Sequence, residues 1–216
     1  MKQEFLIRER HPRLLLFFAG WGGEANLFRD YRPAESDFLL CSDYRSPAFD
    51  DTLLAGYREI RLAAWSMGVW MAGRTLAGRS LPLTRCTAVN GTMTPIDDRR
   101  GIPTAVFQGT LDAFGPVTLM KFRRRMCDTV EGVKAFLAHA PARPPEDLRE
   151  ELACIREAVA ARPAAPFAWD RALVGSRDRI FPLPNQLAAW EGVPTEVYDE
   201  AHYSEYLLHK ALEEGW

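Results

Sequence analysis

Apolar residues gather in short continuous runs along the chain, and polar segments or segments with helical spacing separate these runs. A run of four to eight apolar residues that ends at a glycine or a polar residue is typical of a strand covered on both faces, as in parallel sheets. The clearest run covers residues 14–20 and ends at a glycine. Further runs of this kind cover residues 38–42, 60–65, 86–91, 171–175 and 195–198. Helical character follows at 69–78 and from about residue 204, so the alternation predicts an α/β fold with a mostly parallel, doubly wound sheet.

The pattern changes between residues 97 and 168. A short strand-like piece at 104–107 is followed by two or three amphipathic helices. Along one of them the apolar positions 148, 152, 155 and 159 form a single stripe at helical spacing. We therefore predict a small helical cap, residues 97–168, inserted into a core made of residues 1–96 and 169–216.

Composition and charge narrow the class of protein. The chain has a formal charge of −2 with 47% hydrophobic and 26% charged residues, which is typical of a globular protein and argues against a general nucleic-acid binder. The longest apolar stretch, 14–21, is too short for a membrane-spanning helix, and residues 1–10 lack the apolar core of a secretion signal. The four cysteines are widely spaced, so we expect reduced thiols in a cytoplasmic protein. We also expect a monomer without membrane or nucleic-acid partners.

A candidate nucleophile lies where the strand at 60–65 meets the following helix. The segment Ala64-Trp65-Ser66-Met67-Gly68 places a serine between small residues two positions away on either side. This is the nucleophile elbow of α/β-hydrolases, a sharp turn that projects the serine hydroxyl above the sheet edge, here with alanine in place of the usual first glycine. The alternative is a serine that only caps the helix.

A nucleophilic serine needs a base and an acid that orients the base. His202 follows the last predicted strand, where these hydrolases carry the base, although a surface-loop histidine is the alternative. Asp178 follows the penultimate strand, which makes the order Ser66, Asp178, His202 that of the fold. Asp112 and Asp128 in the predicted cap remain alternative acids. The arginines on either side of Asp178 leave open that it is an ion-paired surface residue.

The tetrahedral intermediate of ester hydrolysis needs two hydrogen-bond donors for its oxyanion. We expect one to be the backbone N–H of Met67, directly after the nucleophile. The other is the amide of Trp21, in the segment Gly20-Trp21-Gly22-Gly23 after the first buried strand. The alternative is a glycine-rich turn with the Trp21 side chain in the core. This chemistry requires no metal and no organic cofactor.

Together these segments resemble the BioG family of pimeloyl-[acyl-carrier protein] methyl ester esterases. The similarity extends over nearly the whole chain and includes Phe18-Ala19-Gly20-Trp21-Gly22, Cys41-Ser42-Asp43-Tyr44-Arg45, Trp65-Ser66-Met67-Gly68-Val69-Trp70, Asn90-Gly91-Thr92, residues 122–127 and Ala201-His202-Tyr203. The resemblance implies removal of a methyl group from pimeloyl-carrier methyl ester during biotin synthesis, which releases methanol. It implies a triad of Ser66, Asp178 and His202 with the amides of Trp21 and Met67 as oxyanion donors. An acid inside the cap is also compatible with it.

The predicted cap has features that suit this substrate. Five apolar side chains are candidate walls for a long acyl chain: Phe107, Leu111, Phe114, Leu119 and Phe122. The densest cationic cluster is Lys121-Phe122-Arg123-Arg124-Arg125, and we expect it to bind substrate and to dock the acidic acyl carrier protein. On a helix Lys121, Arg124 and Arg125 share one face. The alternative is a solvated helix whose cations pair with nearby acids.

The triad residues do not determine which ester is the substrate. Two other functions therefore remain open: a serine esterase or thioesterase on another small acyl substrate, and a non-catalytic binding protein on a hydrolase scaffold. Another esterase or thioesterase would use the same predicted catalytic residues. In a binding protein these residues would have no catalytic role.

Overall fold

The computed structural model describes residues 1–139, 142–161 and 166–214. Its centre is one seven-stranded sheet with the strand order β1-β3-β2-β4-β5-β6-β7. The strands are β1 (Lys2–Ile7), β2 (Arg13–Phe18), β3 (Asp37–Ser42), β4 (Glu59–Trp65), β5 (Leu83–Val89), β6 (Arg171–Gly175) and β7 (Thr195–Tyr198). Neighbouring strands are parallel, except that β1 pairs antiparallel with β3.

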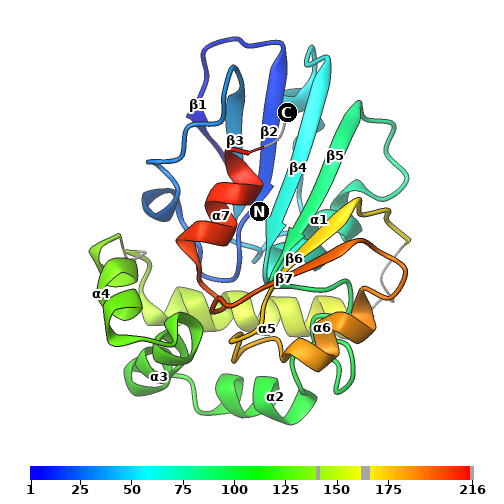
Figure 1. Ribbon diagram of the computed structural model, residues 1–216. Helices are drawn as coiled ribbons and strands as arrows, with labels where there is room; N and C mark the ends of the chain where they lie inside the picture. Colours follow the sequence, from blue (N-terminus) through cyan, green and yellow to red (C-terminus); the bar gives the residue numbers. More distant parts are fainter. Residues whose placement is uncertain (140–141, 162–165, 215–216) are drawn as a thin grey trace.

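The helices lie on both faces of the sheet and across one of its ends. They are α1 (Met67–Leu76), α2 (Thr104–Asp112), α3 (Pro116–Cys127), α4 (Val130–Ala138), α5 (Pro145–Ala161), α6 (Leu183–Ala189) and α7 (Glu205–Leu212). In Figure 1, α7 lies in front of the sheet and α1 behind it, while α2 to α5 lie together below it. The predicted fold class, a mostly parallel doubly wound sheet, is confirmed. The continuous apolar runs follow from this layering, and Leu14 to Phe18 of β2 are completely buried.

Two local predictions were wrong or incomplete. Residues 104–107 are not a strand, because they begin α2, in which Phe107 and Leu111 lie four positions apart and are both buried. Strand β1 was not predicted. It is an edge strand whose residues are partly exposed, so its sequence has no continuous apolar run.

Helices α2 to α5 all lie between β5 and β6 in the sequence, and we call them the cap helices. They fall inside the predicted cap segment, 97–168; its residues 140–141 and 162–165, and residues 215–216 of the predicted core, lie outside the described residues. The segments that directly follow β2 and β3 both donate hydrogen bonds to α5. The cap helices therefore cover the carboxyl ends of the parallel strands, where ligands bind in folds of this kind.

A buried arginine anchors the last helix to the sheet. Arg61 interrupts the apolar strand β4 and is 2% exposed. Its guanidinium donates hydrogen bonds to the carbonyl oxygens of Leu212 and Glu214 at the end of α7. Burial lowers the pKa of Arg61 to about 10. This contact holds the helix that follows the predicted base.

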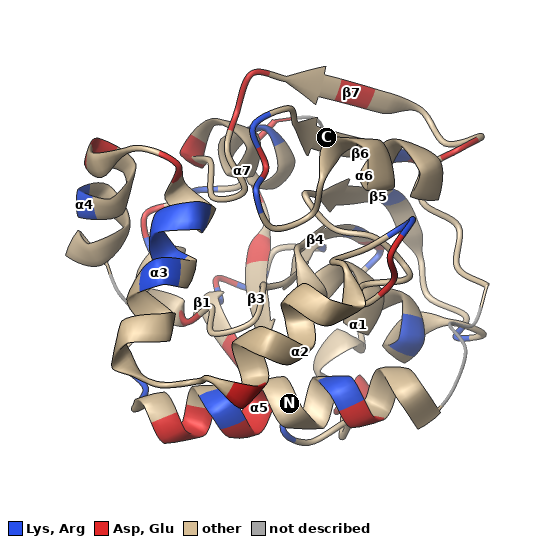
Figure 2. Ribbon diagram, turned by 90° about the horizontal axis from the view of Figure 1, so that it is seen from below, with Lys and Arg blue, Asp and Glu red and all other residues tan. Residues whose placement is uncertain are grey.

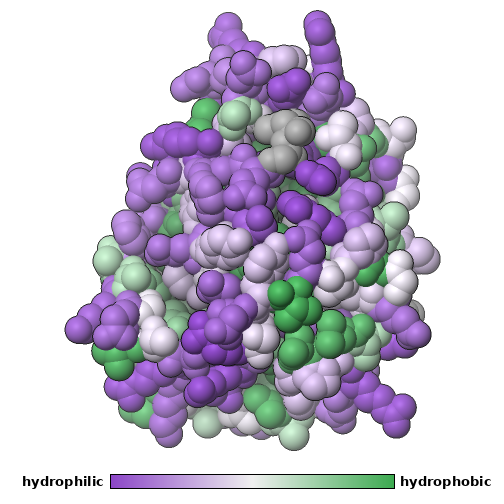
Figure 3. Space-filling view, in the orientation of Figure 1, coloured by the Kyte–Doolittle hydropathy of each residue, from purple (hydrophilic) through white to green (hydrophobic). Residues whose placement is uncertain are grey.

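The face of the molecule in Figure 3 is mostly hydrophilic, and its apolar side chains form only small groups. Within the described ranges, no helix combines the length and the hydropathy that a membrane span needs. The four cysteines are free thiols.

Candidate active site

Ser66 lies between β4 and α1 in a strained turn. Its backbone has φ 59° and ψ −126°, a conformation that side-chain-bearing residues rarely adopt. Close backbone contacts hold the turn: a Cβ on Gly68 would lie 2.3 Å from the carbonyl oxygen of Phe18, and one on Gly91 would lie 2.2 Å from that of Ser66. The Ser66 side chain makes no capping hydrogen bond to α1. The structure thus has the geometry of a nucleophile elbow rather than of a simple helix cap.

The structure brings Ser66, His202 and Asp178 together, although they are far apart in the sequence. The Nε2 atom of His202 lies 2.9 Å from the Oγ atom of Ser66, and its Nδ1 atom lies 2.8 Å from Oδ2 of Asp178. All three side chains are nearly inaccessible to water, with 1% exposure at His202. In such a hydrogen-bonded series an imidazole can accept a proton from a serine while a carboxylate holds its other nitrogen.

The carboxylate of Asp178 is held by groups on its own loop and on α6. Its Oδ1 atom accepts hydrogen bonds from the N–H groups of Ile180 and Phe181, at 2.7 and 2.8 Å. Its Oδ2 atom accepts a further bond from Nε2 of Gln186, at 3.1 Å. Gln186 is fully buried on α6 and was not predicted from the sequence, because a glutamine in an amphipathic helix gives no sign that it faces a carboxylate.

Side chains from the end of β4 and from the residue after β5 hold the loop that carries His202. The side-chain amide of Asn90 donates to the carbonyl oxygens of Ala201 and His202, each at 2.9 Å, and its oxygen accepts from the N–H of Gly175. The indole N–H of Trp65 donates to the carbonyl of His202 at 3.0 Å. Asn90 and Trp65, which both lie in segments that carry the family resemblance, thus hold the loop of His202 in place.

The alternative acids lie elsewhere. Asp112 is exposed on α2, where its carboxylate accepts a hydrogen bond from Gln108. Asp128 lies just after α3 and forms ion pairs with Arg177 and Arg179. The arginines beside Asp178 therefore contact a carboxylate of the cap segment, and the geometry does not make Asp178 an ion-paired surface residue.

The two candidate oxyanion donors are backbone N–H groups near Ser66; a Cβ on Gly20, next to Trp21, would lie 3.0 Å from the Cβ atom of Ser66. Met67 follows Ser66 at the first position of α1, and Trp21 lies in the loop after β2. Within the described part of the chain, no acceptor takes a hydrogen bond from either amide. The Trp21 side chain is buried, as the alternative required, but its ring also lines the pocket over Ser66. The structure thus leaves both amides available as candidate donors.

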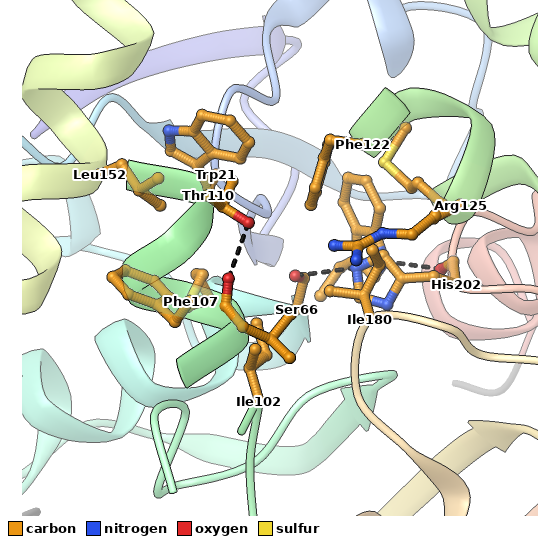
Figure 4. A pocket seen from close by; sticks show the side chains of 14 residues that line it. Trp21, Ser66, Ile102, Phe107, Thr110, Phe122, Arg125, Leu152, Ile180 and His202 are labelled. Carbon is orange, nitrogen blue, oxygen red and sulfur yellow. Dashed lines mark hydrogen bonds between the residues drawn. The ribbon is translucent and has the colours of Figure 1, made fainter. Parts of the chain in front are cut away.

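The pocket over Ser66 is mainly apolar, and about 480 Å³ in it and at its mouth is free of protein atoms, part of this space being open to solvent. Figure 4 shows Phe107 and Phe122 from the cap helices facing Trp21, Ile102 and Ile180 around the serine. Of the five predicted wall residues, Phe107 and Phe122 line this pocket. Leu119 lines a second compartment behind the Trp21 ring, Phe114 packs edge-on against that ring, and Leu111 is buried.

Among the described residues, Arg125 is the one Lys or Arg that lines this pocket. It reaches into the pocket from α3 on the side of His202 (Figure 4) and is half-buried. Its Nε atom has no hydrogen-bond partner among the described residues. A cation in an apolar pocket favours a substrate that carries a polar group beside its apolar part.

The other cations of α3 lie on two different sides. Lys121 and Arg124 are exposed and line, together with Arg125, a groove between α2 and α3. The groove shares Val106, Thr110, Phe122 and Arg125 with the pocket over Ser66, so it leads from that pocket to the surface. Arg123 instead lies over the ring of Phe136 and lines the second compartment, where burial lowers its pKa.

Figure 2 shows that α3 carries Lys and Arg without an acidic residue, whereas α5 carries both signs of charge. The groove face of α3 is therefore positive. In the described ranges, no three His, Cys, Asp or Glu side chains are arranged to hold a metal ion.

Comparison with known proteins matches residues 1–211 to the family model described as pimeloyl-ACP methyl esterase BioG. The chain belongs to the BioG family. A solved structure of BioG from Haemophilus influenzae matches this BioG-family chain with a TM-score of 0.90 and 36% identity, covering 99% of this chain and all of that one. A putative non-heme bromoperoxidase from Mycobacterium tuberculosis H37Rv matches with a TM-score of 0.64 at 14% identity, covering 97% of this chain and 92% of that one, which shows the α/β-hydrolase fold alone.

Among curated relatives, a malonyl-[acyl-carrier protein] O-methyltransferase of Bacteroides fragilis (strain 638R) is 48% identical over 200 residues. The match covers 92% of this BioG-family chain but only 41% of that protein. The chain thus spans about two fifths of this relative's length. The name O-methyltransferase describes the whole of that longer protein. An uncharacterised protein of Haemophilus influenzae is 41% identical over 82% of this chain and 81% of its own length.

Proposed function

We propose that this protein is a serine carboxylesterase that hydrolyses the methyl ester of pimeloyl-[acyl-carrier protein] to free pimeloyl-[acyl-carrier protein] and methanol, in cytoplasmic biotin synthesis. The observation that carries the proposal is the hydrogen-bonded series from Ser66 through His202 to Asp178 below an apolar pocket. The family description supports the choice of ester.

In the proposed mechanism, Nε2 of His202 takes the proton of Ser66 as its oxygen attacks the ester carbonyl. The N–H groups of Trp21 and Met67 bind the oxyanion of the tetrahedral intermediate. Methanol leaves with the proton from His202 and an acyl-enzyme remains. His202 then takes a proton from a water molecule, which attacks the carbonyl carbon of the acyl-enzyme. His202 gives this proton to the oxygen of Ser66 as the acyl group leaves. Asp178 holds the imidazole in the required tautomer and stabilises its cationic form.

The shape and charge of the cap helices support a carrier-bound acyl substrate. The apolar pocket suits a methylene chain, and the α2–α3 groove continues from it to the surface. Lys121 and Arg124 stand at the outer part of this groove, where an acidic carrier would meet them. Arg125 lies further in, next to the reacting ester.

The name of the Bacteroides fragilis relative is compatible with this reaction. An O-methyltransferase that acts on a malonyl carrier makes a methyl ester at the free carboxyl of a carrier-bound acyl group. The proposed esterase removes a methyl ester of the same class. The two reactions thus act on the same functional group in opposite directions.

The direct test is incubation of the protein with methyl pimeloyl-carrier, with methanol and free carrier thiol measured in parallel. We expect one methanol per substrate and no thiol. Release of thiol without methanol would replace the proposal with a thioesterase. Faster turnover of short p-nitrophenyl esters than of the carrier ester would indicate a general esterase. Absence of turnover and of fluorophosphonate labelling would indicate a binding protein.

Reversing the charge of the exposed groove cations should weaken carrier binding. We expect Lys121→Glu combined with Arg124→Glu to raise KM for methyl pimeloyl-carrier roughly tenfold, because two favourable charge contacts become repulsive. The effect should shrink at high salt, which screens exposed charges. Steady-state kinetics at low and high ionic strength measure it. Arg125 is left unchanged because it lines the pocket over Ser66.

The matched control reverses one lysine and one arginine of the cap helices that do not line the groove. Lys134 on α4 and Arg149 on α5 are both exposed. Lys134→Glu with Arg149→Glu should change KM less than twofold. Equal effects of the two double variants, or an equal rise in KM for a small methyl ester without a carrier, would contradict docking at the groove.

A further inference from the structure

A carboxylate on cap helix α5 is fully buried and has no part in the proposed proton transfers. Glu151 has 0% exposure. Its Oε2 atom accepts a hydrogen bond from Nη1 of Arg143 at 2.7 Å and from the N–H of Gly22 at 3.4 Å, and its Oε1 atom accepts from the N–H of Tyr44 at 3.0 Å. The carboxylate thus joins α5 to the loops that follow β2 and β3.

The same face of α5 holds the Trp21 side chain. The carbonyl oxygen of Leu148, one turn before Glu151, accepts a hydrogen bond from the indole N–H of Trp21 at 2.8 Å. Tyr44 completes the attachment, because its hydroxyl donates to the carbonyl oxygen of Ala19 at 2.6 Å. The chain is therefore fixed on both sides of the Trp21 amide, at Ala19 and at Gly22.

We propose that Glu151 is a positioning residue for the oxyanion hole: through Gly22 and Tyr44 it orients the loop after β2 so that the N–H of Trp21 faces the reacting oxygen. The inference rests on the proposed esterase function, since that reaction develops the oxyanion. A donor stabilises the oxyanion only at 2.7 to 3.1 Å from the position that this oxygen takes up, so a small rotation of the loop removes most of its effect.

The ion pair with Arg143 explains how the Glu151 carboxylate can be fully buried. Burial raises the pKa of Glu151, and the Arg143 guanidinium together with the Tyr44 N–H opposes that rise. Nη2 of Arg143 also contacts Oδ1 of Asp43 at 3.4 Å. Replacing buried ion pairs by apolar residues is often neutral for stability, so stability alone does not account for this one. Alignment of the loop after β2 accounts for the buried ion pair between Glu151 and Arg143.

The test compares Glu151→Gln with Glu150→Gln, which is the same change at the adjacent residue. Glu150 is exposed and pairs with Arg45, and within the described residues it accepts no hydrogen bond from Gly22 or Tyr44. We expect Glu151→Gln to lower kcat roughly tenfold with KM changed less than twofold. Its affinity for an alkylboronic acid, which forms a tetrahedral adduct with the serine, should fall by a similar factor. Glu150→Gln should match the wild type in all three measurements.

A second variant separates positioning from loss of stability. Glu151→Gln takes the charged partner at Nη1 away from the largely buried Arg143 and leaves it the longer contact with Asp43, whereas Glu151→Gln with Arg143→Met removes the cation as well. We expect the double variant to regain a wild-type Tm while kcat and boronic acid affinity stay low. Recovery of kcat together with Tm would overturn the inference, and so would wild-type values for Glu151→Gln or a loss confined to KM.

The wild-type protein distinguishes failure of this inference from failure of the proposed function. Wild-type protein that neither hydrolyses esters nor reacts with a fluorophosphonate would overturn the proposed function, and this inference with it. If the wild type does both and Glu151→Gln behaves identically, only the inference fails.

Discussion

Ser66→Ala should abolish methyl ester hydrolysis, with a loss in kcat of at least about 10³-fold. The substitution removes the oxygen that lies 2.9 Å from Nε2 of His202 and leaves the imidazole with no proton to accept. The backbone of the elbow does not depend on the hydroxyl, because the side chain makes no capping bond to α1. Folding, followed by Tm, should therefore stay close to that of the wild type. Methanol release and fluorophosphonate labelling measure the loss.

The control for this prediction is Ser176→Ala. Ser176 is exposed just after β6, where its hydroxyl contacts Asp199, and it has no contact with His202. It should retain wild-type methanol release and labelling. Substantial turnover by Ser66→Ala would show that another group attacks the ester.

Asp178→Asn should lower kcat by about 10⁴-fold at neutral pH. In the proposed mechanism the Asp178 carboxylate accepts a hydrogen bond from the N–H at Nδ1 of His202, which leaves Nε2 unprotonated and facing Ser66. An asparagine amide in the same place presents a donor to Nδ1 and favours the opposite tautomer, which cannot accept the serine proton. KM should change little, because Asp178 is not among the residues that line the pocket.

Asp128→Asn is the matched control, because Asp128 is one of the two alternative acids, with Asp112, that the sequence leaves open. It pairs with the exposed Arg177 and Arg179, so its neutralisation weakens ion pairs away from His202 and should change kcat only severalfold at most. A loss of activity larger for Asp128→Asn than for Asp178→Asn would overturn the assignment of the acid. The tautomer of His202 in each variant can be read from imidazole nitrogen chemical shifts.

The sequence was most informative where one local rule sufficed. Strand β2 was predicted because a strand covered on both faces needs a continuous apolar run. The position of Ser66 was predicted because an elbow needs small residues at fixed distances from the serine. His202 and Asp178 followed from these, since parallel strands end at one edge of the sheet and side chains just beyond them meet.

Features that depend on contacts between distant segments were missed. Strand β1 pairs at the edge of the sheet and is only partly buried, so its sequence has no clear pattern. Residues 104–107 have apolar and β-branched side chains that suit a short strand, but burial of Phe107 and Leu111 on one face makes them part of a helix. Local preference is weak over four residues, so tertiary packing decides such a segment.

The sequence by itself determined the fold class, the elbow at Ser66 and the two side chains that can meet it, because these follow from periodicity and from the order of elements. Only the tertiary structure decided which cations face the groove and which polar residues are buried beside the site. Arg125 and Arg123 are two positions apart, yet one lines the pocket over Ser66 and the other packs on Phe136. Glu151 and Gln186 look like ordinary polar helix residues until α5 and α6 pack on the core. The physical reason is that burial of a polar side chain depends on what covers it, and the covering segments lie far away in the chain.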